Sequence, residues 1–389
     1  MKVLRQIADI AERECRIMGK NPIFLFCMVL LPAFVVCFFT SLLDDGQPVE
    51  LPIGVVDQDN SSTSRQLIRT LDSFQTSHMV SHYENTNMAR QAIQRGEIYA
   101  FLLIPKGTEA GLMASKQPKI SFYYNGVVML AGSTTFRDLK TISMLGSASV
   151  GSKKLAALGK TEREIKAFLQ PINIDLHMVN NPQANYNIYL STTMVPGLLM
   201  LFVFLITPYS IGTELKFGRA HEWMYKADFN PCIAIAGKIL PQTLIFFIVF
   251  CCYEFYIYHI LEFPHPGGVL PIILLGLMAV LSAQCFGIFI FGLIPSLRMS
   301  MTICSLWAVV SFSLAGATYP VFSMDPFIQG VSWVFPLRHY YMIYQINIFN
   351  GYPFSFAWEN WLCLAAFLVL PAFVMRNIRR AMLVYKYIP

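Results

Sequence analysis

Charged residues are scarce in this chain of 389 residues. Lys, Arg, Asp and Glu together make up 13% of it, against the roughly 25% typical of soluble globular domains. Hydrophobic residues reach 55% and aromatic residues 14%. This composition excludes a soluble enzyme and predicts a polytopic membrane protein.

Catalytic and metal-binding patterns are also lacking. The sequence contains no Ser, His and Asp constellation, no paired catalytic carboxylates and no zinc-ligand spacing. All nine cysteines lie outside residues 44–187, and a domain of that length can bury a core without disulfides. We therefore expect no catalytic residue, no cofactor site and no metal site in this chain.

One segment has the alternating oxygen-bearing residues that open a calcium loop. Its members are Asp57, Asp59, Ser61 and Thr63. Ser62 stands where such a loop needs Gly, and Ile68 stands where it needs Glu. The segment is therefore predicted to be a turn that caps a helix.

Six apolar runs are long enough to cross a hydrocarbon core, which takes about 20 residues. They are predicted at residues 22–43, 188–211, 233–258, 269–293, 300–321 and 358–375. The first run has no small-residue cleavage site behind it, so it is expected to be an uncleaved span. The fold class is accordingly an α-helical polytopic membrane protein with six transmembrane helices.

The distribution of cations predicts the orientation, because short loops rich in Lys and Arg stay in the cytoplasm. Cations gather in residues 1–21, in the loop at 212–232, near Arg298 and in the tail at 376–389. Both termini are then cytoplasmic. The net charge of +6 comes mostly from these flanks, so it indicates topology and not nucleic-acid binding.

Residues 44–187 are expected outside the cytoplasm, since long domains translocate largely regardless of charge. Strands are predicted at 51–56, 78–83, 98–104, 120–124 and 172–179, and helices at 62–74, 86–95, 107–115, 127–158 and 161–169. The alternation predicts an inserted extracytoplasmic α/β domain with a largely parallel sheet.

Residues 1–21 form a predicted amphipathic helix along the inner membrane surface. Its apolar stripe consists of Leu4, Ile7, Ala11, Cys15 and Met18. Opposite the stripe lie Arg5, Arg13 and Arg16. Anchoring by these cations and a direct docking role are both open for this helix.

Two further features concern the outer side. Residues 322–357 are aromatic but interrupted by Pro326 and Pro336, which favours short re-entrant or interfacial helices; an aromatic belt without function is the alternative. Glu254 lies inside the third span, where an unpartnered charge costs at least about 2.5 kcal/mol. It either reaches water at the outer end or belongs to a membrane pathway.

Several short motifs occur in a recognisable order along the chain. They are VVDQDNSS at 55–62, AFLLIP at 100–105, GTELKFGRAHEW at 212–223, GKILP at 237–241 and PLRHYY at 336–341. With the topology, they make nearly the whole chain resemble the permease subunits of type-2 ATP-binding-cassette (ABC) transporters, of the exporter type with a large extracytoplasmic domain. The chain departs from the family in having FGRAHEW and NP where relatives usually have RGT before TP.

The resemblance implies roles for three segments. Residues 212–232 would contain the coupling helix that docks on an ATPase, residues 1–21 would be the elbow helix, and residues 322–357 would be the outer re-entrant helices. The expected docking residues are Lys216, Arg219, Glu222, Trp223 and Tyr225. A position at the membrane interface is the alternative for these side chains.

The expected function is that of the permease subunit of an ATP-driven exporter in the inner (plasma) membrane. Its cargo would be hydrophobic or amphipathic, drug-like or lipid-linked. A separate ABC ATPase would hold ATP and Mg, and a second copy or a paralogous permease would complete a dimer. The outer domain offers a place for a periplasmic adaptor. A membrane-anchored external binding or assembly factor and a secondary carrier remain alternatives.

Overall fold

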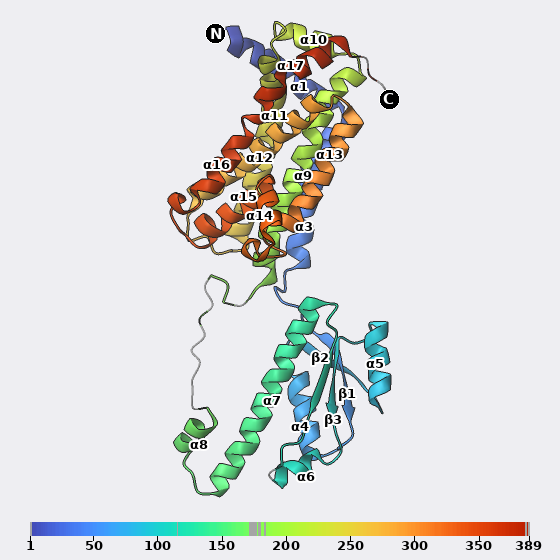
Figure 1. Cartoon of the computed structure of the whole chain (residues 1–389), viewed down its shortest axis with the longest axis vertical. Coiled ribbons are helices and arrows are strands. Elements are labelled where there is room, and N and C mark those ends of the chain that lie inside the picture. Colours follow the sequence, from blue (N-terminus) through green and yellow to red (C-terminus); the bar gives the residue numbers. More distant parts are fainter. Residues whose placement is uncertain are drawn as a thin grey trace. The chain divides into compact units, whose positions relative to one another are not determined.

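The computed structural model describes residues 2–114, 116–170, 177, 180–182, 184–385 and 387. The chain is mostly helical with one small sheet, and it divides into two compact units (Figure 1). Unit 1 comprises Met1–Asp44 and Met178–Pro389, and unit 2 comprises Asp45–His177. The predicted insertion of a separate domain after the first span matches this division.

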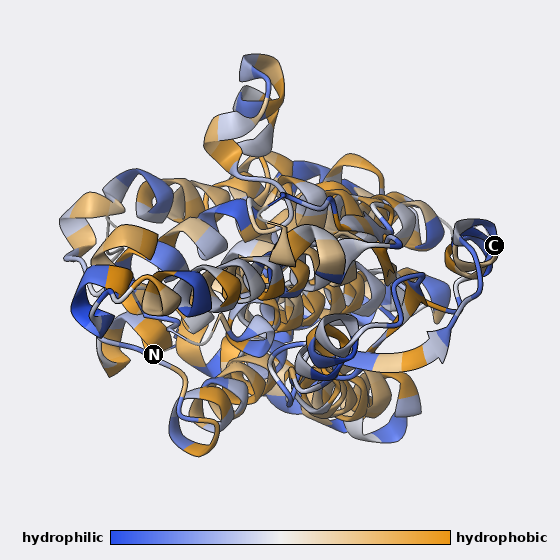
Figure 2. Ribbon diagram, turned by 90° about the horizontal axis from the view of Figure 1, so that it is seen from below, coloured by the Kyte–Doolittle hydropathy of each residue, from blue (hydrophilic) through white to orange (hydrophobic). Residues whose placement is uncertain are grey.

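Six helical segments in the described part of unit 1 are long and apolar enough to cross a membrane, which confirms the predicted number. Each has a high mean hydropathy, and hydrophobic colours cover much of the helical ribbon seen end-on in Figure 2. They are Pro22–Leu42 (α2, Pro22–Leu25; η1, Phe26–Leu30; α3, Leu31–Leu42), Tyr186–Lys216 (α9), Pro231–Ile260 (α11, Pro231–Phe255; η2, Tyr256–Ile260), Val269–Leu293 (α12), Leu297–Leu314 (α13) and Trp358–Val384 (α16, Trp358–Phe367; α17, Leu370–Val384).

Some boundaries differ from those predicted. The fifth span ends at Leu314 and not at residue 321, because the chain turns at Gly316, whose φ of +101° suits glycine. The second span continues as helix to Lys216. The apolar pattern of the sequence extends past the turn in one case and stops short of the helix end in the other.

Much of the expected cytoplasmic tail at residues 376–389 is helical. Helix α17 continues to Val384, and its residues Ile378, Ala381 and Met382 are buried. One face of this cationic helix is apolar and packs into the core of unit 1. The helix therefore continues beyond the point where the mean hydropathy falls.

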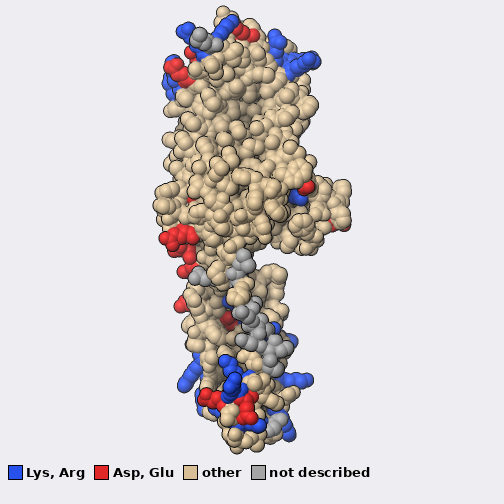
Figure 3. Space-filling view, turned by 90° about the vertical axis from the view of Figure 1, so that its left-hand side faces the viewer, with Lys and Arg blue, Asp and Glu red and all other residues tan. Residues whose placement is uncertain are grey.

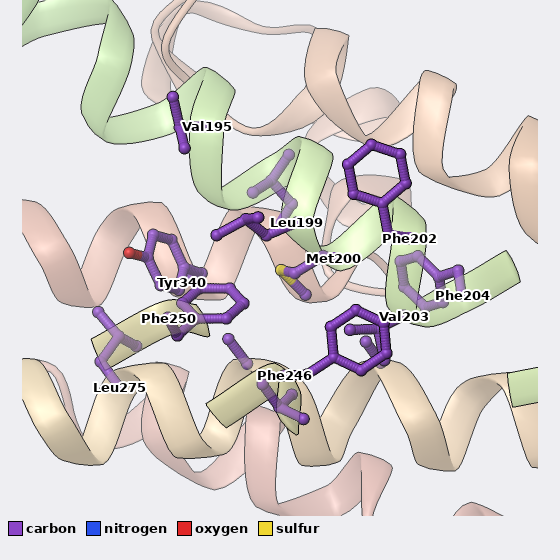
Figure 4. Packing of buried hydrophobic residues seen from close by; sticks show 14 of the residues in the cluster. Val195, Leu199, Met200, Phe202, Val203, Phe204, Phe246, Phe250, Leu275 and Tyr340 are labelled. Atoms are coloured by element: carbon purple, nitrogen blue, oxygen red, sulfur yellow. The ribbon is translucent and has the colours of Figure 1, made fainter. Parts of the chain in front are cut away.

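The core of unit 1 forms around α9. Its residues Leu199 and Val203 are fully buried, and Figure 4 shows side chains from α11, α12 and α15 (Pro336–Ile343) directed toward this helix. Phe246, Phe250 and Leu275 are among these partners. Such all-round burial explains why α9 has no polar face.

The aromatic segment after α13 folds into short helices, in agreement with the predicted interruption by prolines. They are η3 (Val321–Ser323), α14 (Pro326–Ser332), α15, η4 (Tyr344–Phe349) and η5 (Phe354–Phe356). His339 of α15 contacts the chain on both sides of its helix. Its Nε2 lies 2.7 Å from the carbonyl oxygen of Trp333, just after α14, and its Nδ1 lies 3.0 Å from the side-chain oxygen of Asn360 in α16. The PLRHYY motif therefore fixes α15 to α16.

Unit 2 contains a four-stranded sheet with the order β2-β1-β3-β4. The strands are β1 (Leu51–Asp57), β2 (Ser77–His82), β3 (Ala100–Ile104) and β4 (Ser121–Tyr124). β1 runs parallel to β2 and β3, whereas β4 is antiparallel to β3. The predicted parallel sheet is present with one antiparallel edge. The strand predicted at 172–179 lies outside the described residues, apart from His177.

Helices cover both faces of this sheet. They are α4 (Ser62–Asp72), α5 (Thr86–Arg95), α6 (Thr108–Met113), α7 (Met129–Ala157) and α8 (Glu162–Leu169). Val55 packs with Leu71 of α4 and Leu139 of α7, while the next residue, Val56, packs on the other side with Ala89 of α5. This alternation follows from the two-residue period of a strand.

The loop between β1 and α4 is the predicted helix cap. Ser61 accepts a hydrogen bond from the Ser64 amide in a capping box. Asp59 accepts hydrogen bonds from the amides of Gly107, Thr108 and Glu109 at 2.7 to 3.0 Å. Hydrogen bonding from the Ser61 side chain and from these amides holds the pKa of Asp59 below its ordinary value.

Candidate functional site

A short helix between the second and third spans forms the centre of the site. Helix α10 (Ala220–Lys226) follows Gly218, whose φ is +65°, and is followed by Asp228 and Phe229, which also have positive φ. Asn230 then caps α11 by accepting a hydrogen bond from the Cys232 amide. Two tight turns thus fix the direction of α10.

Helix α10 lies at the same end of unit 1 as α1 (Lys2–Lys20) and the end of α17 (Figure 1). Lys and Arg side chains gather at this end, beside a broad uncharged surface over the bundle (Figure 3). A charged end beside an apolar band is typical of a helical bundle at a membrane boundary.

Four buried charges join three helices beneath α10. Arg13 of α1 donates two hydrogen bonds to the Glu214 carboxylate of α9, at 3.0 and 2.9 Å. Lys238 of α11 contacts Glu214 at 2.7 Å and Glu14 of α1 at 2.6 Å. We call Arg13, Glu14, Glu214 and Lys238 the four-charge network; its two cations balance its two anions.

The network is buried and further hydrogen-bonded. The side chains of Glu14, Glu214 and Lys238 are at most 1% exposed, and that of Arg13 is 10% exposed. Ser210 donates to Glu14 at 2.9 Å, and Gln242 donates to Ser210 at 2.7 Å. Burial of this kind makes each charge depend on its partners, because an uncompensated charge in a low dielectric is costly.

Trp223 attaches α10 to this network. Its indole ring lies 5.1 Å from the Lys238 ammonium nitrogen, and its Nε1 donates to the Ala234 carbonyl oxygen at 3.2 Å. The side chain is fully buried among apolar residues of α1, α9, α11 and α17. Helix α10 is thus packed against α11 through its largest residue.

The family model described as ABC-2 family transporter protein matches residues 22–374. The chain belongs to the ABC-2 transporter family. Two curated relatives are each named "Inner membrane transport permease YhhJ", one from Escherichia coli (strain K12) and one from Shigella flexneri. Each is 19% identical over 369 residues, which is 94% of both chains.

The match confirms the family resemblance carried by the motifs, and it makes this ABC-2 protein a multi-pass membrane transporter component rather than an enzyme. The matched residues include α9, α10 and α11 but begin after α1. Half of the four-charge network, Arg13 and Glu14, therefore comes from a helix outside the family match.

The expected docking residues of this ABC-2 protein have different environments. Glu222 and Tyr225 are exposed on α10, and Glu222 forms ion pairs at 3.5 Å with both Arg13 and Lys226. Lys216 and Arg219 lie beside α1. The Trp223 side chain is fully buried and faces the core, where it supports α10; a docking contact through Trp223 stays a prediction.

Sequence reasoning missed Glu14 and Glu214 and assigned Arg13 to the outer face of the first helix. The structure buries Ile10, Arg13, Glu14 and Met18 of α1, whereas Leu4 of the predicted stripe is exposed. The position of Glu214 directly after the second apolar run was a usable signal. A carboxylate there needs a charge partner, so a nearby cation could have been sought.

The start of α1 is also joined to the turn after α10. Lys2 forms an ion pair with Asp228 at 2.8 Å, and Gln6 donates to the same carboxylate oxygen at 2.8 Å. The Lys2 and Gln6 hydrogen bonds lower the pKa of Asp228. These surface contacts add a second connection between α1 and the α10 segment, although exposed ion pairs contribute little to stability.

Glu254 lies away from the network, near the end of α11. Its side chain is buried beside Gly276 of α12, and its Oε2 has no hydrogen-bond partner in the described part of the chain. A side chain larger than hydrogen at Gly276 would meet the carboxylate, since a Cβ there would lie 2.9 Å from Oε1. Glu254 is thus buried within the chain, and its two expected roles, reaching outer water and belonging to a membrane pathway, stay predictions.

No group of three or more His, Cys, Asp or Glu side chains suited to a metal ion occurs among the residues that the structure describes. The side chains at the cation-rich end form ion pairs, hydrogen bonds and packing contacts. These interactions can position a helix and transmit its movement.

Proposed function

We propose that this chain is the permease subunit of an ATP-driven exporter in the inner membrane, and that a separate ABC ATPase docks on α10. The carrying observation is the attachment of α10 to three other helices through Trp223 and the four-charge network. Family membership and the name of the curated relatives support the assignment to transport.

The orientation in this proposal follows from the cations. The end of unit 1 that contains α1, α10 and the end of α17 is rich in Lys and Arg, so it faces the cytoplasm. Unit 2 then lies outside the cytoplasm. There it guides cargo away from the membrane or receives a periplasmic adaptor.

The docking surface in this proposal is the exposed side of α10. Tyr225 is 66% exposed and borders a hollow of about 470 Å³ together with Asp9, Asp228 and Phe229. An exposed aromatic residue beside polar groups is a common centre of an interface. Glu222 lies one helical turn before Lys226 and completes the charged edge.

A displacement of α10 by the ATPase would be transmitted directly to the spans that contact it. Trp223 contacts Lys238 of α11, and Lys238 is paired with Glu214 of α9 and Glu14 of α1. Because the network is buried and balanced, its members move together or lose their charge partners. ATP and Mg belong to the partner ATPase in this scheme.

A second permease copy or a paralogue completes the pathway in this proposal. Large apolar side chains remain exposed on several spans of unit 1, including Phe34, Leu244, Leu306 and Phe373. They suit contact with lipid and with another permease.

Glu254 is proposed as a pathway residue, since a buried carboxyl group inside a span marks a functional position more often than a structural one. The cargo is hydrophobic or amphipathic.

Transport by inverted membrane vesicles that contain the permease and its ATPase tests the direction. A panel of amphipathic fluorescent dyes serves as cargo, and Glu254→Gln is compared with wild type. Export predicts ATP-dependent accumulation of at least one dye inside the vesicles. A permease with its partner ATPase inactivated in its nucleotide site is the control.

The contrary outcomes separate the alternatives. ATP-driven loss of preloaded dye would mean import. Accumulation that collapses with an ionophore and ignores ATP would identify a secondary carrier. If no dye moved under any condition, but unit 2 still bound a dye, the result would favour an external binding or assembly factor.

A further inference from the structure

A cleft separates α1 from α10 and the end of α9. Its volume is about 700 Å³, and six of its lining residues are Lys or Arg while two, Asp9 and Glu222, are acidic. Its lining therefore has an excess of positive charge. It suits an anionic ligand.

Some of these cations already have partners. Arg13 is paired with Glu214, Arg16 with Glu12 at 2.5 Å, and Lys226 with Glu222 at 3.5 Å.

Others remain available. Lys20 and Lys216 have no carboxylate within ion-pair distance in the described part of the chain. Arg219 forms only a long ion pair, with its Nε 3.9 Å from the Glu214 carboxylate, and its side chain is 32% exposed.

Phe217 holds two of these cations near one another. The Lys216 ammonium nitrogen lies 5.7 Å from the centre of the Phe217 ring, and the Arg219 guanidinium carbon lies 5.1 Å from it. The ring is 56% exposed. Two cations beside one exposed ring form a fixed positive patch, because the ring restrains both side chains.

The cleft also borders the first span. Pro22 and Ile23, which begin that span, line it together with Ile17 and Phe217. Asn21 donates to the Tyr209 hydroxyl at 3.0 Å and closes one side with polar groups. Cations at one edge and apolar side chains at the other match a molecule with an anionic head and hydrocarbon tails.

We propose that this cleft binds the phosphate headgroup of an anionic phospholipid, with Lys20, Lys216 and Arg219 as the headgroup ligands. An acidic segment of a protein partner would satisfy the cations but would leave the apolar edge at Ile23 facing a polar chain. Lipid satisfies both edges. The proposal does not depend on export or on an ATPase.

The test is a titration of phosphatidylglycerol into the purified full-length protein in neutral detergent, read as the shift of the thermal unfolding midpoint. Phosphatidylcholine is titrated in parallel. Wild type should prefer phosphatidylglycerol. The double variant Lys20→Gln/Lys216→Gln should lose roughly tenfold or more of its apparent affinity for phosphatidylglycerol. The matched control Lys106→Gln/Lys116→Gln removes two exposed cations of unit 2 and should behave as wild type.

Three outcomes would overturn the lipid site. Equal responses of the two double variants would mean that the cleft does not select the headgroup. An equal stabilisation of wild type by inorganic phosphate would mean that a soluble anion is the ligand. Unchanged phosphatidylglycerol affinity of Lys20→Gln/Lys216→Gln, together with loss of ATPase assembly, would assign the cleft to a protein partner.

Discussion

Lys238 contacts both carboxylates of the four-charge network, so single residues control the stability of this end of unit 1. Its ammonium group lies 2.6 Å from Glu14 and 2.7 Å from Glu214. Without it, Glu14 would lose its ammonium partner, and Glu214 would keep Arg13 and the longer contact with Arg219 at 3.9 Å. Breaking a buried pair costs more than the pair contributes, because the remaining charge stays desolvated.

Replacement of Lys238 by Met should therefore lower the free energy of unfolding by about 3 to 5 kcal/mol, measured by thermal unfolding in detergent. Lys226→Met is the matched control; its exposed pair with Glu222 predicts a loss of about 1 kcal/mol or less. The double variant Lys238→Met/Glu14→Gln restores charge balance and should regain part of the loss. A double variant less stable than Lys238→Met would contradict the network.

Asp59 gives unit 2 a pH-dependent contact between the loop after β1 and the start of α6. Its pKa in the folded chain lies below the ordinary value, which is about 3.9 when unfolded. The stabilising contribution of the carboxylate is therefore present above the unfolded pKa and is lost as the pH falls through the lower folded pKa.

Hydrogen exchange of residues 105–112, corrected for intrinsic rates, should then show less protection in Asp59→Asn than in wild type at pH 6. The difference should shrink as the pH falls below about 4. Thr70→Ala is the control, because the Thr70 hydroxyl donates to the Gln66 carbonyl oxygen of its own helix and the three amide contacts stay in place. A difference that persists unchanged at low pH would mean that the carboxylate charge is not responsible.

At the scale of elements, the packing of α1 on α11 depends on the absence of a side chain at Gly237. A Cβ there would lie 2.7 Å from the Ile10 Cβ and 2.9 Å from the Ile7 carbonyl oxygen. The backbone of α1 cannot yield as a flexible side chain would. This close approach is what brings Arg13 and Glu14 within reach of Lys238.

Gly237→Val should consequently displace α1, at a cost of about 1 to 3 kcal/mol, and should speed tryptic cleavage at Arg13 and Arg16. Gly19→Val is the matched control on α1, because no atom lies within 4 Å of its added Cβ. Equal cleavage rates of the two variants would show that α1 does not depend on this contact.

Elements with a strong local pattern could be predicted from the sequence. The six spans follow from apolar length, and the order of strands and helices in unit 2 follows from alternation and caps such as Ser61. The end of the fifth span could not be predicted, because Ala315 and Ala317 are apolar although the chain turns between them.

The site was less predictable, because its contacts join residues about 200 positions apart. Arg13 and Glu214 are 201 residues apart, and no local pattern pairs them. Trp223 stands in a helix of seven residues, which is too short for periodicity to distinguish its buried face. Its burial depends on α11 and α17 packing on that side.

The two units of the whole molecule have separate roles. Unit 1 contains the spans, α10 and the network that connects them, whereas unit 2 is a separate α/β domain inserted after the first span. In the proposed exporter an ATPase acts on α10 from the cytoplasm, and the spans change their arrangement in response. Docking on α10 is the step on which the other parts of this account depend.

Site-specific photocrosslinking in membranes that contain the permease and its ATPase tests this step most directly. A photoreactive amino acid replaces Tyr225, and in a separate variant it replaces Tyr319, which is 53% exposed after the far end of α13. The account predicts that the Tyr225 variant captures the ATPase and that the Tyr319 variant does not. Capture at Tyr319, or a Tyr225 variant that transports normally yet never captures the ATPase, would contradict docking on α10.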